Sequence, residues 1–198
     1  MVLNIEMDHV DYFSSMAQIR RSFSAYMTLT GQDGVAIINA DDENVMLAAK
    51  FFGGRKVTFS TKDPSADYSA ANIVFDMGRA EFDVVRSGAF AAHIKLSVPG
   101  AHNVYNALAA FAAACECGLD GERAAEGISR FAGAHRRMEY KGSFCGAAVY
   151  DDYGHHPTEV RATLRTMREV GTGRLFCVFQ SHTYSRTARL FEDFAAAL

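Results

Sequence analysis

The chain has 198 residues, of which 49% are hydrophobic and 22% charged, with a formal net charge of −3. This composition is typical of a soluble globular protein that can bury a core without disulfides or a metal, and it gives no basic field for nucleic acid. The sequence has no run of 18 or more apolar residues and no basic-then-apolar leader, which argues against membrane insertion and secretion. We therefore expect a cytoplasmic protein with neither a nucleic-acid nor a membrane partner.

Both ends of the sequence resemble interior segments of a longer chain. Met1 leads at once into the apolar run 2–5, and the amphipathic stretch 191–198 stops without a helix C-cap. Since natural domain ends usually lie in polar, frayed segments, we expect a fragment.

The first part of the chain predicts a βαβ unit. Residues 35–38 are an apolar run typical of a buried parallel strand. A turn and helix N-cap at 39–42 leads into a helix that ends at Gly53-Gly54, and 56–59 predicts the next strand.

An antiparallel hairpin and two helices are expected next. From about residue 73 to residue 98 the apolar residues alternate around a turn at 86–88, which predicts the hairpin. Apolar residues at helical spacing follow from about Asn103, and a second helix is expected over 121–130.

The pattern then restarts, so we expect a domain boundary near residue 133. A strand at 147–150 is followed by Pro157 at a first helical position, and 175–179 predicts another buried strand before the terminal helix. This is a second βαβ unit, and polar residues follow both of its strands, where ligands bind in open α/β sheets.

The four cysteines lack the CxxC pairs of a zinc site. We expect reduced thiols that are buried as small hydrophobic side chains. They are Cys115, Cys117, Cys145 and Cys177.

Two polar clusters lie in the first part of the chain. Residues 4–11 hold three acids and His9, and such oxygen-rich sites suit Mg²⁺, although taken alone the cluster is more typical of a solvated loop. Residues 100–106 open a helix with His102, Asn103 and Asn106. An Asn amide offers the donor and acceptor that an adenine edge requires, and the alternative is N-capping by Asn103.

Two more clusters follow the boundary. Arg136 and Arg137 precede residues 151–156 and are suited to clamping phosphate, while a strand-end Asp can accept from ribose hydroxyls; a surface ion-pair network is the alternative. In residues 182–186, the Arg186 guanidinium suits a substrate carboxylate. The alternative there is an exposed loop in which Arg186 pairs with an acid such as Glu192 or Asp193.

The order of these clusters resembles that of the Mur ligase family. The matching stretches occur in the same order as in the family and span nearly the whole chain. The run 151–159 is the most specific of them. They are 4–9, 99–110, 136–139, 151–159 and 182–187. Tyr153 stands where members that attach a recycled murein tripeptide usually have phenylalanine, which favours the members that add L-alanine.

The resemblance implies an α/β fold with parts of two three-layer domains. Residues 1–132 would be the latter part of a P-loop-like central ATPase domain with a small antiparallel hairpin, and 133–198 the start of a Rossmann-like C-terminal domain. The family's phosphate loop, GxxxxGK[ST], is absent from this sequence and would lie upstream of Met1. We therefore expect the fragment alone to be inactive.

The resemblance also implies ligands and residue roles. ATP and Mg²⁺ would be the cofactors, and UDP-N-acetylmuramate and L-alanine the substrates, joined through an acyl phosphate. His9 would bind Mg²⁺; His102, Asn103, Asn106, Arg136, Arg137 and Asp152 would bind the nucleotide; Tyr153, His155, His182 and Arg186 would bind alanine; and Arg137, Asp152 and His155 would act in catalysis.

Three other functions stay open at this point. One is tripeptide recycling by a murein-peptide ligase, and another is a non-catalytic folding or interaction module. The third is a metallohydrolase using Asp8, His9, Asp152, His155 and His156, which tightly held zinc or manganese would support.

Overall fold

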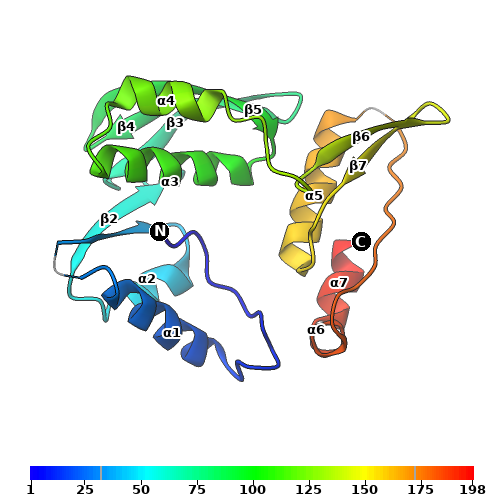
Figure 1. Ribbon diagram of the computed structural model, residues 1–198, viewed down its shortest axis with the longest axis horizontal. Helices are drawn as coiled ribbons and strands as arrows, with labels where there is room; N and C mark the ends of the chain where they lie inside the picture. Colours follow the sequence, from blue (N-terminus) through cyan, green and yellow to red (C-terminus); the bar gives the residue numbers. More distant parts are fainter. Residues whose placement is uncertain (32, 172) are drawn as a thin grey trace.

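The computed structural model describes residues 1–31, 33–171 and 173–198. Its elements form two groups that lie side by side (Figure 1), the sheet region (residues 1–132) and the ribbon region (residues 133–198). Among the described residues, no helix has the length and apolar character to cross a membrane.

One five-stranded mixed sheet forms the centre of the sheet region. Its strands, in spatial order, are β1 (Val35–Asn39), β2 (Arg55–Ser60), β3 (Tyr68–Asp76), β4 (Arg79–Arg86) and β5 (Ala89–Pro99). The first three are parallel, and β3, β4 and β5 are antiparallel. The predicted βαβ unit and the hairpin β4–β5 are confirmed. The sequence did not indicate that β3 begins at Tyr68 and joins the two into one sheet.

Helices cover both faces of the sheet at β1 and one face at the hairpin. They are α1 (Met16–Thr28), α2 (Glu43–Ala49), α3 (His102–Glu116) and α4 (Gly121–Ser129). Successive strand side chains point to opposite faces, so Ala36 and Ile38 pack with α1 and α2 while Ile37 packs with α3. The sheet region is therefore three-layered at its parallel edge.

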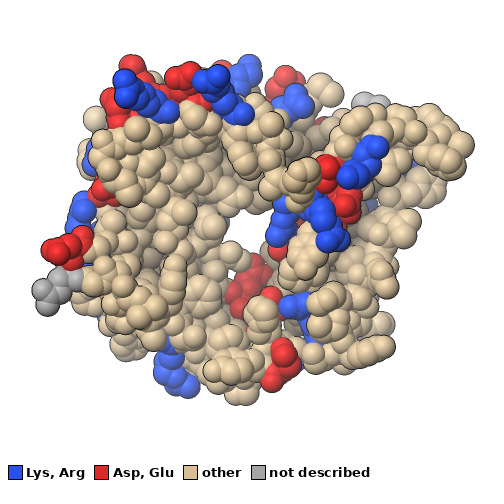
Figure 2. All heavy atoms as spheres, viewed as in Figure 1, with Lys and Arg blue, Asp and Glu red and all other residues tan. Residues whose placement is uncertain are grey.

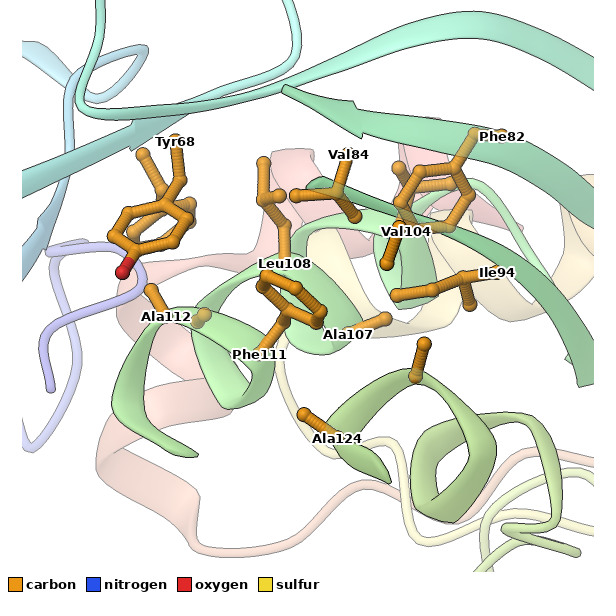
Figure 3. Packing of buried hydrophobic residues seen from close by; sticks show 14 of the residues in the cluster. Tyr68, Phe82, Val84, Ile94, Val104, Ala107, Leu108, Phe111, Ala112 and Ala124 are labelled. Atoms are coloured by element: carbon orange, nitrogen blue, oxygen red, sulfur yellow. The ribbon is translucent and has the colours of Figure 1, made fainter. Parts of the chain in front are cut away.

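The main core lies between the hairpin and α3. Phe82, Ile94, Leu108 and Phe111 are fully buried there, and Figure 3 shows the strand side chains facing the helix. Burying one such side chain contributes roughly 1.5–3 kcal/mol.

The ribbon region has fewer layers. The strands β6 (Glu139–Phe144) and β7 (Ala147–Asp151) form an antiparallel pair, and the helices are α5 (Pro157–Val170), α6 (Tyr184–Arg189) and α7 (Phe191–Ala197). Its small core contains Val160, Leu190, Phe194 and Ala197. The polar, largely exposed β6 gave no sequence signal.

Two predictions for the ribbon region are wrong. Residues 175–179 form no strand, and Phe176 and Val178 are 77% and 101% exposed, so the second βαβ unit is not formed. A buried parallel strand needs a hydrogen-bonded neighbour and cover on both faces, whereas β7 pairs with β6 instead.

The cysteines are unpaired, as expected, but they are not buried. Cys115 is half-buried, while Cys117, Cys145 and Cys177 are exposed. Their positions explain this: Cys117 is the C-cap of α3, Cys145 lies in the turn between β6 and β7, and Cys177 is in the uncovered segment.

Candidate functional site

Residues 6–14 belong to the sheet region and make contacts with the ribbon region. The Glu6 carboxylate accepts a hydrogen bond from the Thr158 hydroxyl at 2.6 Å, and His156 Nε2 donates to the Met7 carbonyl at 3.1 Å. Asp8 binds Arg186. This segment therefore brings together three clusters that are far apart in the sequence.

The Asp8–Arg186 ion pair is the most buried of these contacts. Nε and Nη2 of Arg186 lie 2.8 and 2.7 Å from Asp8 Oδ1, and Arg186 is only 6% exposed. Burial opposes ionisation of Asp8, but the His9 N–H and the Arg186 guanidinium outweigh it and lower the pKa of the Asp8 carboxyl. The alternative partners proposed for Arg186, Glu192 and Asp193, are wrong, because the acid it contacts comes from the other end of the chain.

The loop after β7 is organised by Asp152. Its Oδ1 accepts from the Gly154 N–H at 2.7 Å and its Oδ2 from the Met138 N–H at 2.9 Å. A Cβ at Gly154 would lie 2.9 Å from Asp152 Oδ1, so a side chain at this position would push the carboxylate away. Asp152 is thus held firmly at the start of the loop.

His156 and Glu159 start α5 by a capping box. The His156 side chain accepts from the Thr158 N–H, and Glu159 accepts from the His156 N–H at 3.2 Å and the His155 N–H at 2.9 Å. Pro157 occupies the first helical position, as predicted. Residues 155 and 156 therefore have a defined backbone direction.

Two arginines and an aromatic ring lie beside this loop. The Arg136 guanidinium is 4.6 Å from the centre of the Tyr153 ring and 3.6 Å from Asp151, and Arg137 is 3.4 Å from Glu159. The ring of His155 contacts Tyr153 edge-on. Both arginines keep about half their side-chain surface exposed, so the predicted ion pairs exist and leave each guanidinium accessible to an anion.

The start of α3 faces the same loop. The charges of Asp152 and Arg137 both reach His102, whose pKa is lowered mainly by its dense protein surroundings although part of the residue stays exposed. Asn103 Nδ2 donates to the Pro99 carbonyl at 2.7 Å, and its Oδ1 accepts from Asn106 at 3.0 Å. N-capping by Asn103 is wrong, because the cap is Ala101.

The residues described here do not make a metal site by themselves. The His9 side chain is 70% exposed and lies 3.8 Å from Asp8, and no group of three His, Cys, Asp or Glu side chains within the described ranges could hold a metal. The metallohydrolase alternative is not supported, because Asp8 binds Arg186 and His156 caps α5. His9 supplies one possible Mg²⁺ ligand.

Several of these segments have backbone in the left-handed region. His9, Arg136, Met138 and Thr183 have φ of 48°, 58°, 48° and 66°. Such strain costs about 1–3 kcal/mol per residue and is concentrated at functional sites. Thr183 follows the exposed His182 and precedes α6, which carries Arg186.

A half-buried polar network was not predicted from the sequence. At the ends of β1 and β2, Asp41 accepts from the Ser60 hydroxyl and from the Thr61 N–H at 2.9 Å, and Thr61 donates to the Tyr105 hydroxyl at 2.6 Å. Despite burial, which raises it, the pKa of Asp41 is lowered by these donors. The signal was available: Asp41 follows a parallel strand, where ligands gather.

A cavity of about 330 Å³ lies between the two regions beside Glu6, His156 and Arg161. Figure 2 shows an opening between the regions, with acidic residues along its lower margin and basic residues to its right. The margins of this opening thus carry negative charge, which could attract an amine, and positive charge, which could attract an anion.

Comparisons with known proteins show the family of the chain. The model of the Mur ligase middle domain matches residues 1–114, and that of the Mur ligase glutamate ligase domain matches residues 136–198. The chain belongs to the Mur ligase family.

Relatives of this Mur ligase chain are longer than the chain. The UDP-N-acetylmuramate–L-alanine ligase of Caldicellulosiruptor saccharolyticus is 44% identical over 198 residues, which are 100% of this chain and 43% of that protein. The crystal structure of MurF from Acinetobacter baumannii has a TM-score of 0.74 at 25% identity, covering 85% of this chain and 37% of that one. The UDP-N-acetylmuramate–alanine ligase of Thermotoga maritima has a TM-score of 0.68 at 28% identity, covering 85% of this chain and 38% of that one.

Proposed function

We propose that this chain is part of an ATP-dependent cytoplasmic ligase that joins L-alanine to the carboxylate of UDP-N-acetylmuramate. One observation carries the proposal: residues 6–14 contact both His156 and Arg186, and the charges of Asp152 and Arg137 reach His102 at the start of α3, so clusters from both regions lie around the loop after β7. The 44% identical relative is named for alanine ligation rather than for tripeptide recycling, which supports the alanine assignment.

The proposed nucleotide-binding roles are those that the family resemblance implies for these residues. His102, Asn103 and Asn106 would contact the nucleotide from α3. Asp152 would hold the ribose with its remaining lone pairs, although both of its oxygens already accept backbone hydrogen bonds. Arg136 and Arg137 would neutralise phosphate charge, since their guanidinium groups are half-exposed and can take bidentate contacts.

The alanine end of the site would lie in the ribbon region. Arg186 would hold the alanine carboxylate, and Tyr153, His155 and His182 would surround the amino acid. ATP, when bound, would supply the phosphoryl group that turns the muramoyl carboxylate into an acyl phosphate, leaving ADP. Attack by the alanine amine would then form the amide bond and release inorganic phosphate and a proton. His9 would be one ligand of Mg²⁺. The protein's contribution is then mainly positioning and charge neutralisation, as in other phosphoryl transfers.

The chain spans 43% of the length of the relative that it matches, and it holds no GxxxxGK[ST] motif. We propose that it comprises parts of two domains divided near residue 133, and that alone it forms no alanyl bond. Without the backbone cradle and lysine of a phosphate loop, little holds the transferring phosphate.

Kinetics of Arg186→Lys in the whole ligase test the assignment. Lysine keeps the charge but loses the planar fork, so we expect the KM for L-alanine to rise by about tenfold to a hundredfold while the KM for ATP changes little. Arg165→Lys, in an exposed ion pair of α5, is the matched control and should change neither constant. An unchanged alanine KM together with a lower melting temperature would show that Arg186 is only structural.

A further inference from the structure

The guanidinium of Arg186 already holds a carboxylate. Nε and Nη2 both point to Asp8 Oδ1 at 2.8 and 2.7 Å. These are charge-assisted contacts of the kind that an arginine makes with the carboxylate of an amino acid. Arg186 therefore cannot give these two donors to a ligand while the ion pair is intact.

We propose that Asp8 is an internal ligand of Arg186, which an amino-acid carboxylate must displace. This inference rests on the proposed role of Arg186. It adds that a carboxylate of the chain itself competes with the amino acid for the Arg186 guanidinium. Arrival of the amino acid would release the Asp8 side chain and break a buried ion pair between the sheet and ribbon regions.

The environment of the pair favours exchange. The Arg186 side chain is 7% exposed, whereas that of Asp8 is 27% exposed, so solvent and ligands reach the pair from the side of Asp8. Replacing one carboxylate by another leaves the buried guanidinium neutralised, which avoids the large cost of an unpaired buried charge.

The rest of the segment can stay in place during the exchange. Thr158 would keep its bond to Glu6, and His156 its bond to the Met7 carbonyl. The effect would first reach His9, whose N–H donates to Asp8 Oδ1 at 2.7 Å. Displacement of Asp8 would thus change the backbone of the residue proposed to meet Mg²⁺.

Binding of L-alanine to the full 198-residue chain, measured by NMR titration without metal, tests the proposal. If the pair is closed roughly nine-tenths of the time, Asp8→Asn should tighten L-alanine binding about tenfold, because the apparent Kd scales inversely with the competent fraction. L-Alaninamide, which lacks the carboxylate, should show no gain. Glu126→Gln, which removes the acid of an exposed ion pair on α4, is the matched control. It should leave the affinities for L-alanine and L-alaninamide unchanged.

Each outcome decides a different point. In the unaltered chain, L-alanine but not its amide should shift the His9 amide resonance, and this readout holds even if Asp8→Asn unfolds. Equal affinity in the unaltered chain and Asp8→Asn, with weaker binding in Arg186→Lys, would overturn the competitor role and leave the proposed function standing. No L-alanine binding in either would overturn the carboxylate role of Arg186, and with it this inference.

Discussion

Similar apolar runs have different structures in the sheet region and in the ribbon region. Residues 35–38 become the buried strand β1, which pairs with β2 and is covered on both faces. Residues 175–179 are just as apolar, yet they remain without a strand partner and largely exposed. An apolar run therefore predicts a buried strand only where the rest of the chain supplies a neighbouring strand and two covering layers.

The same contrast applies to the cores. The sheet region has aromatic side chains of Phe59, Phe82 and Phe111 with no exposed surface. In the ribbon region the core is limited to a few side chains between α5 and α7. We therefore expect equal substitutions to have unequal costs in the two regions.

The largest difference should come from paired phenylalanine truncations. Phe111→Ala should lower the free energy of unfolding by about 3–5 kcal/mol, because it empties a fully packed site. Phe176→Ala should change it by less than about 0.5 kcal/mol, since Phe176 is exposed. Urea unfolding followed by circular dichroism measures both, and similar losses would mean that residues 175–179 are packed in solution.

A smaller difference is expected within the loop after β7. Asp152→Ala leaves the Met138 and Gly154 N–H groups without their acceptor and should cost about 1–3 kcal/mol. Asp151→Ala removes only an exposed ion pair to Arg136 and should cost about 0–1 kcal/mol. In the whole ligase, Asp152→Ala should also weaken ATP binding more than Asp151→Ala. Equal effects in both assays would remove the distinction between the two acids.

The smallest effect should appear in the acid stability of the ribbon region. The Arg136 N–H, followed by Lys141, lowers the pKa of Glu139 from 4.5 to about 2. Because the folded pKa is depressed, this contribution to stability is present above pH 4.5 and is lost as the pH falls toward 2. Glu139→Gln should therefore reduce the loss of folding stability between pH 4.5 and pH 2, as measured from the amide NMR signals of the ribbon region. Signals from the sheet region provide the internal control, and an unchanged ribbon profile would contradict the prediction.

Much of the local structure was decided by residues close together in the sequence. The alternation around Phe82 and Ile94 predicted the hairpin, and Pro157 predicted the start of α5. Strand alternation, helix spacing and capping act over a few residues, so they can be read without knowing the rest of the fold. The order of the polar clusters likewise indicated the family, which the domain models then confirmed.

Other features were decided only by the tertiary structure. Arg186 was expected to meet a ligand or an acid near it in the sequence, but it binds Asp8, 178 residues away. The exposure of 175–179 depends on which strand β7 pairs with, and no pattern within 175–179 records that choice. Contacts of this kind are decided by how distant segments pack, because a guanidinium or an apolar run is compatible with many partners until the folded chain brings one of them close.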